Sequence, residues 1–493
     1  MFTSSETPII GTILLVACAI LGWGFYRARP FGKLGILAWL QSLVLMAPWL
    51  LFFGLFAAGI YINIVGILFL VVGSAGLYIY LGRQLRSAGQ DAILKQRATE
   101  RLATESASPT EDVPPSAGVV IEILPIPEED LQIIRSIFGI DTFFATETIA
   151  YQEGAIFKGN LRGEPQEVHN RLSQSLQEKL GEKYRLFLVD STDGKPVVIV
   201  LPSTNDPRSI TLSQKVFAGI LAIATIATSL ETAGLLLNFD LFAHPERWGD
   251  ALPIGAGIFT ILVAHEIGHW FLARRHQVRL SWPFFLPAVQ IGSFGTITRF
   301  ESLLPNRTVL FDVAVAGPVA GGIVALLMLI VGLLLSHPGS LFQLPNEFFQ
   351  GSILVGSLAR VVLGSALQSP LVSVHPLVVI GWLGLVITAL NLMPAGQLDG
   401  GRIVQAIYGR KTAGRATFAT LILLAVVALG NSLAMYWAIV ILFLQRDLER
   451  PSLNEVSEPD DARAALGLLV LFLMIATLLP LTPGLAGRLG IGG

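Results

Sequence analysis

The chain has 493 residues, of which 53% are hydrophobic and only 14% are charged, against about 25% charged in an ordinary soluble protein. This composition predicts that most of the chain lies in lipid. The net charge of -2 argues against a nucleic-acid-binding protein, which needs a basic surface to neutralise phosphates.

Residues 1–82 are predicted to form an N-terminal membrane segment of three spans, because about 20 apolar residues are needed to cross a bilayer. These spans are Pro8–Tyr26, Leu34–Leu55 and Ile60–Leu81. The first is longer than the apolar part of a signal peptide and has no small-residue cleavage site, so we expect it to be retained. The start also lacks an Arg- and Ser-rich transit peptide, which favours a prokaryotic or already processed chain.

The one long polar section follows these spans and divides into two parts. Residues 83–117 are rich in Ser, Thr, Glu and Pro and read as a flexible linker. Residues 118–208 are predicted to form a small α/β domain, because runs typical of strands and of helices follow one another there. The expected strands are Val119–Leu124, Tyr184–Val189 and Val197–Leu201, and the expected helices are Glu128–Phe138 and Glu167–Lys179.

Residues 209–450 are predicted to form a second membrane region, and residues 451–493 a C-terminal span and tail. The expected spans are Val216–Leu237, Ile254–Ala273, Val309–Leu335, Leu371–Met393, Ala416–Leu429, Leu433–Leu444 and Ala464–Leu481. Ala416–Leu429 and Leu433–Leu444 are short and could form one bent hairpin. The predicted fold is therefore an all-α polytopic membrane protein of about eight to ten transmembrane helices, with a small cytoplasmic α/β domain.

Basic residues predict the orientation of these spans, because Lys and Arg collect in cytoplasmic loops. They follow alternate spans, at Arg27, Arg83, Arg274, Arg402 and Arg446, whereas the opposite loops carry few. The N-terminus is thus expected outside, with the α/β domain in the cytoplasm.

The span Ile254–Ala273 contains the pattern His265-Glu266-Ile267-Gly268-His269. Residues four apart lie on one helix face, so both imidazoles can bind one zinc ion while Glu266 lies beside them. The alternative is two exposed histidines and a surface Glu. Because the motif lies inside an apolar span, that alternative is disfavoured: ionisable side chains are costly in lipid and are usually functional there. The chain's single cysteine, Cys18, lies in the first span, so any metal must use His, Asp or Glu.

A catalytic zinc needs a third protein ligand, and Asp399 is the candidate. It lies in Asn391-Leu-Met-Pro-Ala-Gly-Gln-Leu-Asp399-Gly-Gly401, where Pro394 and the glycines should break the helix. Such a break is tolerated at membrane depth only where it is buried in protein or lines a watery cavity. The alternative is that Asp399 caps a solvated loop. Both His269 and Asp399 shortly precede basic residues, which predicts a metal site toward the cytoplasmic face.

These residues resemble the site-2 protease family of intramembrane zinc metalloproteases, whose signatures are HExxH and NxxPxxxLDG on separate transmembrane helices. The resemblance covers mainly Val216–Leu444. It implies that one zinc is bound by His265, His269 and Asp399, that Glu266 is the general base activating the water at the zinc, and that Asn391 lines the substrate path. Single-span or other membrane proteins are the implied substrates, cleaved within or near the bilayer, with no nucleic acid involved.

Gly159-Asn160-Leu161-Arg162, together with 185–188 and 197–202, resembles the plastid and cyanobacterial branch known as ethylene-dependent gravitropism-deficient and yellow-green proteins. This branch implies a cyanobacterial plasma or thylakoid membrane. The alternative for residues 159–162 is a turn in which Gly and Asn adopt positive φ.

The segment Leu280–Phe300 is rich in Pro, Gly and β-branched residues and suits extended structure. In the family that it resembles, such a segment is a re-entrant β-hairpin. It could add an unwound substrate as a further strand, with Gly292 and Gly295 as tentative substrate-binding residues. The alternative is a structural plug.

The remaining polar residues of the spans are left out of the predicted site. Glu231 and Asp312 could pair with a nearby Arg or His, His276 is expected to be solvated, and His375 to lie at the membrane interface. The glycines around Gly317 and Gly321 are expected to allow close helix packing. A metal transporter or zinc sensor, and a scaffold without proteolytic activity, remain alternatives for the whole chain. Glu266 argues against a transporter, which needs no carboxylate held beside the ion.

Overall fold

The computed structural model describes residues 21–57, 126–151, 153–191 and 194–481, with single positions between 73 and 84 and between 486 and 491. Most of the predicted spans Pro8–Tyr26 and Ile60–Leu81, the linker 83–117 and the strand Val119–Leu124 lie outside the described residues. By internal contacts the chain divides into two units, of which the larger comprises Ile121–Leu423 and Trp437–Gly493.

The smaller unit contains one long described helix, α2 (Gly32–Ala57), which covers the predicted span Leu34–Leu55. A short 3-10 turn, Arg29–Phe31, precedes it, and Gly32 at the junction has a φ of 58°. The indole of Trp39 on α2 donates a hydrogen bond to the carbonyl of Leu21, which fixes the turn between the two apolar segments.

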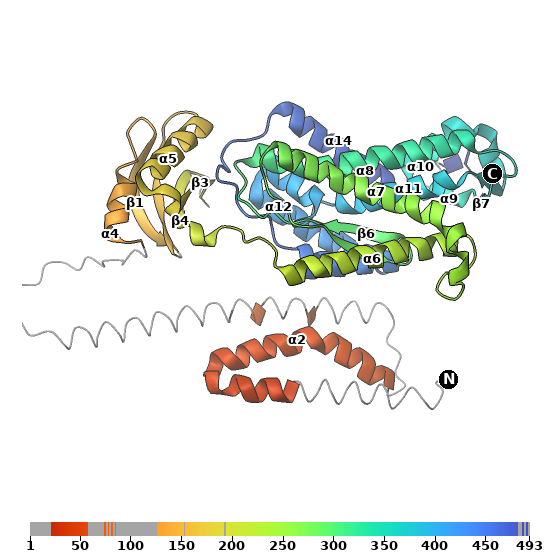
Figure 1. Cartoon of the computed structure of the whole chain (residues 1–493), viewed down its shortest axis with the longest axis horizontal. Helices are drawn as coiled ribbons and strands as arrows, with labels where there is room; N and C mark the ends of the chain where they lie inside the picture. Colours follow the sequence, from red (N-terminus) through yellow and green to blue (C-terminus); the bar gives the residue numbers. More distant parts are fainter. Residues whose placement is uncertain are drawn as a thin grey trace, which may run out of the picture. The chain divides into compact units, whose positions relative to one another are not determined.

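The larger unit begins with an α/β part, seen at one end in Figure 1. Its elements in chain order are α4 (Glu128–Arg135), β1 (Phe143–Tyr151), β2 (Gly154–Leu161), α5 (Pro165–Leu180), β3 (Tyr184–Asp190) and β4 (Pro196–Pro202). The strands form one antiparallel sheet in the order β1-β2-β4-β3. Leu131 of α4, Leu172 of α5 and Phe157 of β2 belong to one buried cluster, so this part has a hydrophobic core of its own.

Strands β1 and β2 were not expected from the sequence. β2 contains two glycines, which weaken a strand pattern, and β1, its partner in the sheet, was missed with it. The structure gives the reason for the two glycines. A Cβ on Gly154 would lie 2.1 Å from the carbonyl oxygen of Val200, and one on Gly159 would lie 2.2 Å from that of Phe144. Gly159 therefore belongs to a strand and not to a turn. The positive φ in this segment, of 103°, is at Gly163, after the end of β2.

The rest of the larger unit is mainly helical, and its long helices run side by side in Figure 1. They are α6 (Leu212–Leu236), α7 (Trp248–Arg275), α8 (Arg307–Leu335), α11 (Pro376–Asn391), α12 (Asp399–Val427), α13 (Ser432–Val440) and α14 (Asp461–Leu478). The end of α12 and the start of α13, within Leu424–Tyr436, are assigned to the smaller unit. Within the described residues, four are long and apolar enough to cross a membrane: α6, α7 with the turn that precedes it, α8 and α14. The protein is thus a multi-pass membrane protein by helix length and composition.

Two predicted spans start at other residues than expected. The helix expected from Leu371 begins only at Pro376, because the residue before a proline disfavours helical backbone, and Leu371–Val374 forms strand β8 instead. The helix expected from Ala416 begins at Asp399, and its basic residues lie in the helix rather than in a loop. It is interrupted at Gly409, whose φ is 78°.

The segment between α8 and α11 is structured, although no element was predicted there. Strand β7 (Phe342–Pro345) pairs with β8, and the short helices α9 (Glu347–Gln350) and α10 (Ile353–Leu363) lie between them in the chain. Each element is too short to give a clear periodic pattern.

The expected extended segment forms a β-hairpin of β5 (Phe284–Ala288) and β6 (Gly292–Ile297). Thr228 and Thr232 of α6 donate hydrogen bonds to the carbonyls of Gly292 and Val289, at 2.6 Å each. These bonds fix the turn of the hairpin against α6.

A backbone ladder joins the α/β part to the helices. Leu188 of β3 exchanges hydrogen bonds with Leu453 and Glu455, at 2.8 and 2.9 Å, while the amides of Leu453 and Asn454 donate to the carbonyls of Leu304 and Pro305. The segment 453–455 therefore extends the sheet from β3 toward the residues that precede α8.

Candidate metal centre and active site

The two histidines of the HExxH pattern lie on the face of α7 that packs against α8. A Cβ on Gly268 would lie 2.4 Å from the carbonyl oxygen of Ala316, so the two helix backbones are in close contact. A Cβ on Gly317 of α8 would lie 2.2 Å from Nε2 of His269, and one on Gly321 would lie 3.0 Å from Cβ of His265. The predicted close packing at these glycines is thus present, and it makes room for the imidazoles.

The structure brings together His265, His269 and Asp399, the three residues that the sequence analysis took as candidate metal ligands. Nε2 of His265 lies 3.1 Å from Nε2 of His269 and 3.1 Å from Oδ2 of Asp399, and Nε2 of His269 lies 3.4 Å from Oδ1 of Asp399. All three side chains are buried. Nδ1 of His269 is 2.8 Å from the carbonyl of Val313, so that ring donates through Nδ1 and turns the lone pair of Nε2 toward Asp399.

Asp399 reaches this point because the chain is not helical between α11 and α12. The amide of Gly396, whose φ is 50°, donates to the hydroxyl of Thr417, and the amide of Gln397 donates to the carbonyl of Gln445. The next helix then begins at Asp399 itself. The predicted break is present, and it places the carboxylate at the start of a helix.

The orientation argument treated Arg402 as a loop residue at the membrane surface. In the structure Arg402 lies one turn beyond Asp399 and is only 5% exposed. Its Nη1 lies 3.9 Å from Oδ1 of Asp399, and its other nitrogens donate to Glu449 at 2.9–3.0 Å and to the carbonyl of Thr298 at 2.7 Å. A buried arginine needs such partners. Arg402 therefore connects Asp399 to the hairpin and to the segment before α14.

Glu266 lies beside the two histidines and is held from the opposite side by the hairpin. Its carboxylate accepts hydrogen bonds from the hydroxyls of Thr296 and Thr298, the latter at 2.8 Å. Both threonines were missed in the sequence analysis. They alternate along one extended segment and so share one face, which is the signal that could have identified them.

The donor set fits zinc. Ligands about 2.0–2.2 Å from a tetrahedral ion lie about 3.3–3.6 Å from one another, close to the spacings of 3.1–3.4 Å among the two imidazoles and the carboxylate. Two His and one Asp are typical zinc donors, and the Nδ1 bond to Val313 is typical of a ligating histidine. Nearby, the ligand atoms of His265, Glu266 and His269 lie within 4.8 Å of one another.

Of the three tentative substrate-binding residues, Gly292 and Gly295 belong to strand β6 of the hairpin, and Asn391 ends α11. The side-chain amide of Asn391 donates to Ile387 at 2.9 Å and to Phe294 at 3.4 Å, and Gly295, whose φ is 108°, leaves room for it. Gly292 lies against Ser229 and Ile258 and does not line the cavity beside Asp399, whereas Asn391 does.

Three polar residues left out of the predicted site have partners in the structure. Glu231 is buried and caps the backbone amide of Leu241. His276 was expected to be solvated, but its Nε2 lies 3.1 Å from Asp312, which also binds Arg463 at 2.6 and 3.0 Å. These contacts connect the end of α7 with the starts of α8 and α14.

Two families match the sequence. Peptidase family M50 matches residues 254–433, which include all four residues of the predicted centre, and the EGY3 middle domain matches residues 132–207 of the α/β part. No solved structure matches the chain significantly.

Plant proteins are similar to most of the chain. The protein named "Probable zinc metalloprotease EGY2, chloroplastic" of Arabidopsis thaliana is 38% identical over 363 residues, which cover 72% of this chain and 65% of the relative. "Probable zinc metalloprotease EGY1, chloroplastic" of the same plant is 36% identical over 402 residues, covering 74% and 73%. The similarity includes both the α/β part and the helices.

Proposed function

Because this chain belongs to peptidase family M50, we propose that it is a zinc metalloprotease that hydrolyses peptide bonds of membrane-spanning proteins within or near the bilayer. The observation that carries the proposal is the convergence of His265, His269 and Asp399, with the carboxylate of Glu266 nearby and hydrogen-bonded to Thr298.

We assign the zinc to His265, His269 and Asp399, and the role of general base to Glu266. The chemistry that a bound zinc supplies is Lewis-acid polarisation of the scissile carbonyl and of a water molecule. Glu266 accepts a proton from that water as the water oxygen bonds to the carbonyl carbon, and then passes the proton to the leaving amine as the C–N bond breaks. Thr296 and Thr298 hold the carboxylate in place for both transfers.

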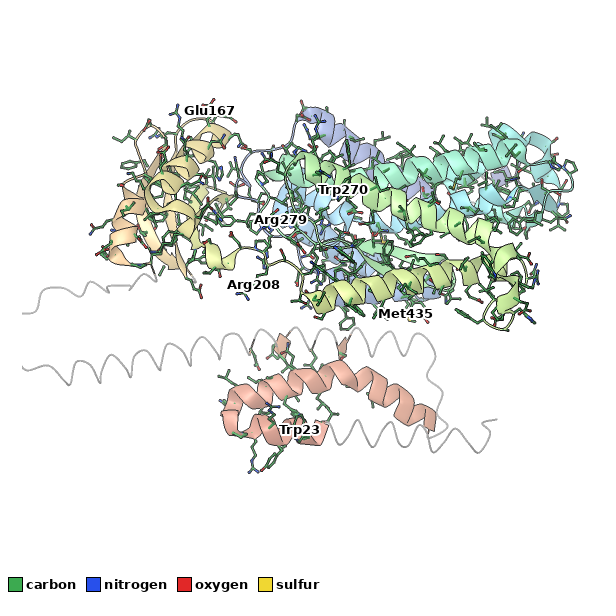
Figure 2. All side chains as sticks on the ribbon, viewed as in Figure 1. Trp23, Glu167, Arg208, Trp270, Arg279 and Met435 are labelled. Atoms are coloured by element: carbon green, nitrogen blue, oxygen red, sulfur yellow. The ribbon has the colours of Figure 1, made fainter. Side chains whose placement is uncertain are left out.

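A groove of about 830 Å³ reaches Glu266 along the end of α7 and the start of the hairpin. Trp270, Arg274 and Trp282 line it, and Figure 2 shows Trp270 on α7 and Arg279 just beyond its end. A helix shields its own peptide bonds, so a substrate must unwind before attack. An extended substrate segment in this groove meets Glu266 and the hairpin together, and Asn391 of α11 contacts the hairpin at Phe294 and Gly295.

We place the metal centre toward the cytoplasmic side of a cyanobacterial plasma or thylakoid membrane, with residues 118–208 in the cytoplasm. Arg274 and Arg275 end the helix that carries the two histidines and Arg279 follows it, and exposed tryptophans beside them suit a membrane interface. The relatives bear the name chloroplastic, which accords with a photosynthetic membrane. Three further spans precede the α/β domain in this arrangement, for eight to ten in all, and the hairpin is re-entrant.

A metal transporter also needs buried His and Asp ligands, but it has no use for a carboxylate oriented by two hydroxyls. The direct experiment is to incubate the purified, zinc-loaded protein in liposomes with candidate single-span proteins and to sequence the fragments. Chelator-sensitive cleavage at one bond is expected. Zinc flux into the liposomes without cleavage of any candidate would favour transport.

A further inference from the structure

The groove that reaches Glu266 is lined by two basic side chains that the proposed mechanism does not use. Arg274 and Arg279 line it together with Trp270 and Trp282. Both arginines are exposed, and Arg274 lies over the ring of Trp270 at 5.3 Å. Among the described residues neither guanidinium has an acidic partner or a hydrogen bond. Two positive charges without a counter-charge therefore border the space in which the proposed function places the substrate.

The acidic side chains of the groove are already engaged. The carboxylate of Glu301 accepts the backbone amide of Ile210 at 3.0 Å. That of Glu266 accepts the hydroxyls of Thr296 and Thr298. Within the part of the chain that the structure describes, no further Asp or Glu and no Lys or His lines the groove. The two arginines are thus the cations that a charged ligand meets there.

The main chain fixes the points from which both arginines enter the groove. Arg274 lies in the last turn of α7, and Gln277, whose φ is 57°, turns the chain away from that helix. The carbonyl of Arg279 accepts the amide of Glu301 at 2.8 Å, and the amide of Arg279 donates to the hydroxyl of Ser302 at 3.0 Å. Only the side chains must therefore be ordered when an anion binds, which lowers the cost of binding.

The spacing along α7 gives the distance between the scissile bond and these charges. Glu266, Trp270 and Arg274 are four residues apart, so they share one face of the helix, and all three line the groove. At about 1.5 Å per residue, Arg274 lies about 12 Å along the helix axis from Glu266. An extended substrate advances about 3.3 Å per residue, so about four residues separate its scissile bond from Arg274.

We propose that Arg274 and Arg279 are specificity-determining residues, which select substrates that carry an Asp or Glu about three to five residues from the scissile bond, toward the end of α7. The selection rests on the proposed protease function, of which it names the substrate class. With the end of α7 in the cytoplasm, this position lies where membrane proteins ordinarily carry Lys and Arg. Such proteins are repelled by the two arginines, so like charge contributes to the specificity.

The test measures binding apart from cleavage. The probes are three fluorescent peptides, each an apolar span of about 20 residues with the same flank of Glu, Gln or Lys at both ends, so that either chain direction can bind. The full chain is used as the zinc-loaded Glu266→Gln protein in an uncharged detergent. Arg274→Gln and Arg279→Gln are added to it and compared with Arg275→Gln. Arg275 is a matched control, because it is exposed at the end of the same helix but does not line the groove.

We expect the Glu peptide to bind about fivefold or more tightly than the Gln peptide, and the Lys peptide to bind most weakly, because one exposed charge pair contributes up to about fivefold. Arg274→Gln and Arg279→Gln should each reduce this preference, and the protein with Glu at both positions should prefer the Lys peptide. Arg275→Gln should keep the original preference. Added salt should weaken it, because exposed charges are screened.

Equal affinities for the three peptides, including no binding of any of them, would overturn the proposal, as would an equal loss of preference in Arg275→Gln. Loss of bound phosphatidylglycerol in Arg274→Gln and Arg279→Gln with an unchanged peptide preference would assign the arginines to anionic lipid and overturn it too. Failure of the wild type to cleave any substrate would instead contradict the proposed function, because the affinities need no turnover.

A scan of cleavage tests the distance. One Glu is moved along the flank of a single-span substrate that the wild type cleaves, and the fragments are sequenced to locate the cut bond. The highest kcat/KM is expected with Glu about three to five residues from that bond, on one side of it. A kcat/KM that does not depend on the position of the Glu would contradict the selection by Arg274 and Arg279.

Discussion

Nε2 of His265 lies 3.1 Å from Oδ2 of Asp399, although 134 residues separate the two in the chain. The contact exists because α7 and α8 pack closely and because the chain is not helical before α12. An apolar span and a broken helix thus meet at one buried point, where three donor atoms have the spacing of a tetrahedral zinc site. Several consequences of this arrangement can be measured.

The zinc assignment predicts that His265→Ala and Asp399→Ala each lower the zinc content of the purified protein well below one per chain, with cleavage falling in parallel. Each change removes one of three protein ligands. His337→Ala is the control, since His337 lies exposed in the turn after α8 and should leave both properties intact. Metal analysis by emission spectroscopy measures the outcome. Full zinc content in Asp399→Ala would remove Asp399 from the ligand set.

The packing of α7 on α8 predicts opposite results for two glycines of one helix. In Gly317→Ala the new methyl would lie 2.2 Å from Nε2 of His269, so the imidazole must move and zinc affinity should fall by about tenfold or more, the usual effect of disturbing a ligand's support. In Gly322→Ala the nearest atom, on Thr388, is 3.6 Å away, and little change is expected. Competition with a fluorescent zinc chelator measures both affinities. Equal affinities would show that the close contact does not control the site.

The hydroxyls that hold Glu266 predict a loss of rate without a loss of metal. Thr298→Val removes one of its two hydrogen bonds and should lower kcat roughly tenfold, part of the 10²–10⁴ that a general base contributes. Thr388→Val is the control, because that hydroxyl bonds only to Gly384 within its own helix. Steady-state cleavage of a reconstituted single-span substrate gives the rates. An unchanged kcat in Thr298→Val would mean that Thr296 alone suffices.

The proposed orientation predicts that Glu167 and Pro338 lie on opposite sides of the membrane. Both are exposed, and α6, α7 and α8 separate them in the chain. A cysteine is placed at one of the two positions in a protein whose Cys18 is replaced by Ser, and sealed vesicles are treated with an impermeant maleimide. Labelling at only one position in intact vesicles is expected, and at both after lysis. Labelling of both in intact vesicles would contradict an odd number of crossings between them.

The sequence predicted those parts of the fold and site that depend on local pattern. Apolar run length located α6, α7, α8 and α14, and motif spacing located His265, Glu266 and His269 before any coordinates. The predicted break before Asp399 followed from one proline and several glycines. In each case the evidence lies within about 20 neighbouring residues, the length of one span.

What the sequence did not predict depends on contacts between distant segments. Arg402 looked like a surface charge, and only its bonds to Glu449 and Thr298 show why it is buried. Strand β2 was missed because it contains Gly154 and Gly159, and these glycines are needed for close contact with the backbones of Val200 and Phe144 in the neighbouring strands. Gln445 belongs to an apolar run that gives no hint of the cavity which it lines. Tertiary contacts override local preference in all three cases.

The central claim is that Glu266 moves the proton and does not bind the metal. Glu266→Gln keeps nearly the same shape, so the variant should retain about one zinc per chain while peptide cleavage falls by about 10²–10⁴. The measurement is zinc content and cleavage rate on the same preparation, with wild type reconstituted in parallel. Zinc-replete Glu266→Gln protein that cleaves at the wild-type rate would contradict the account.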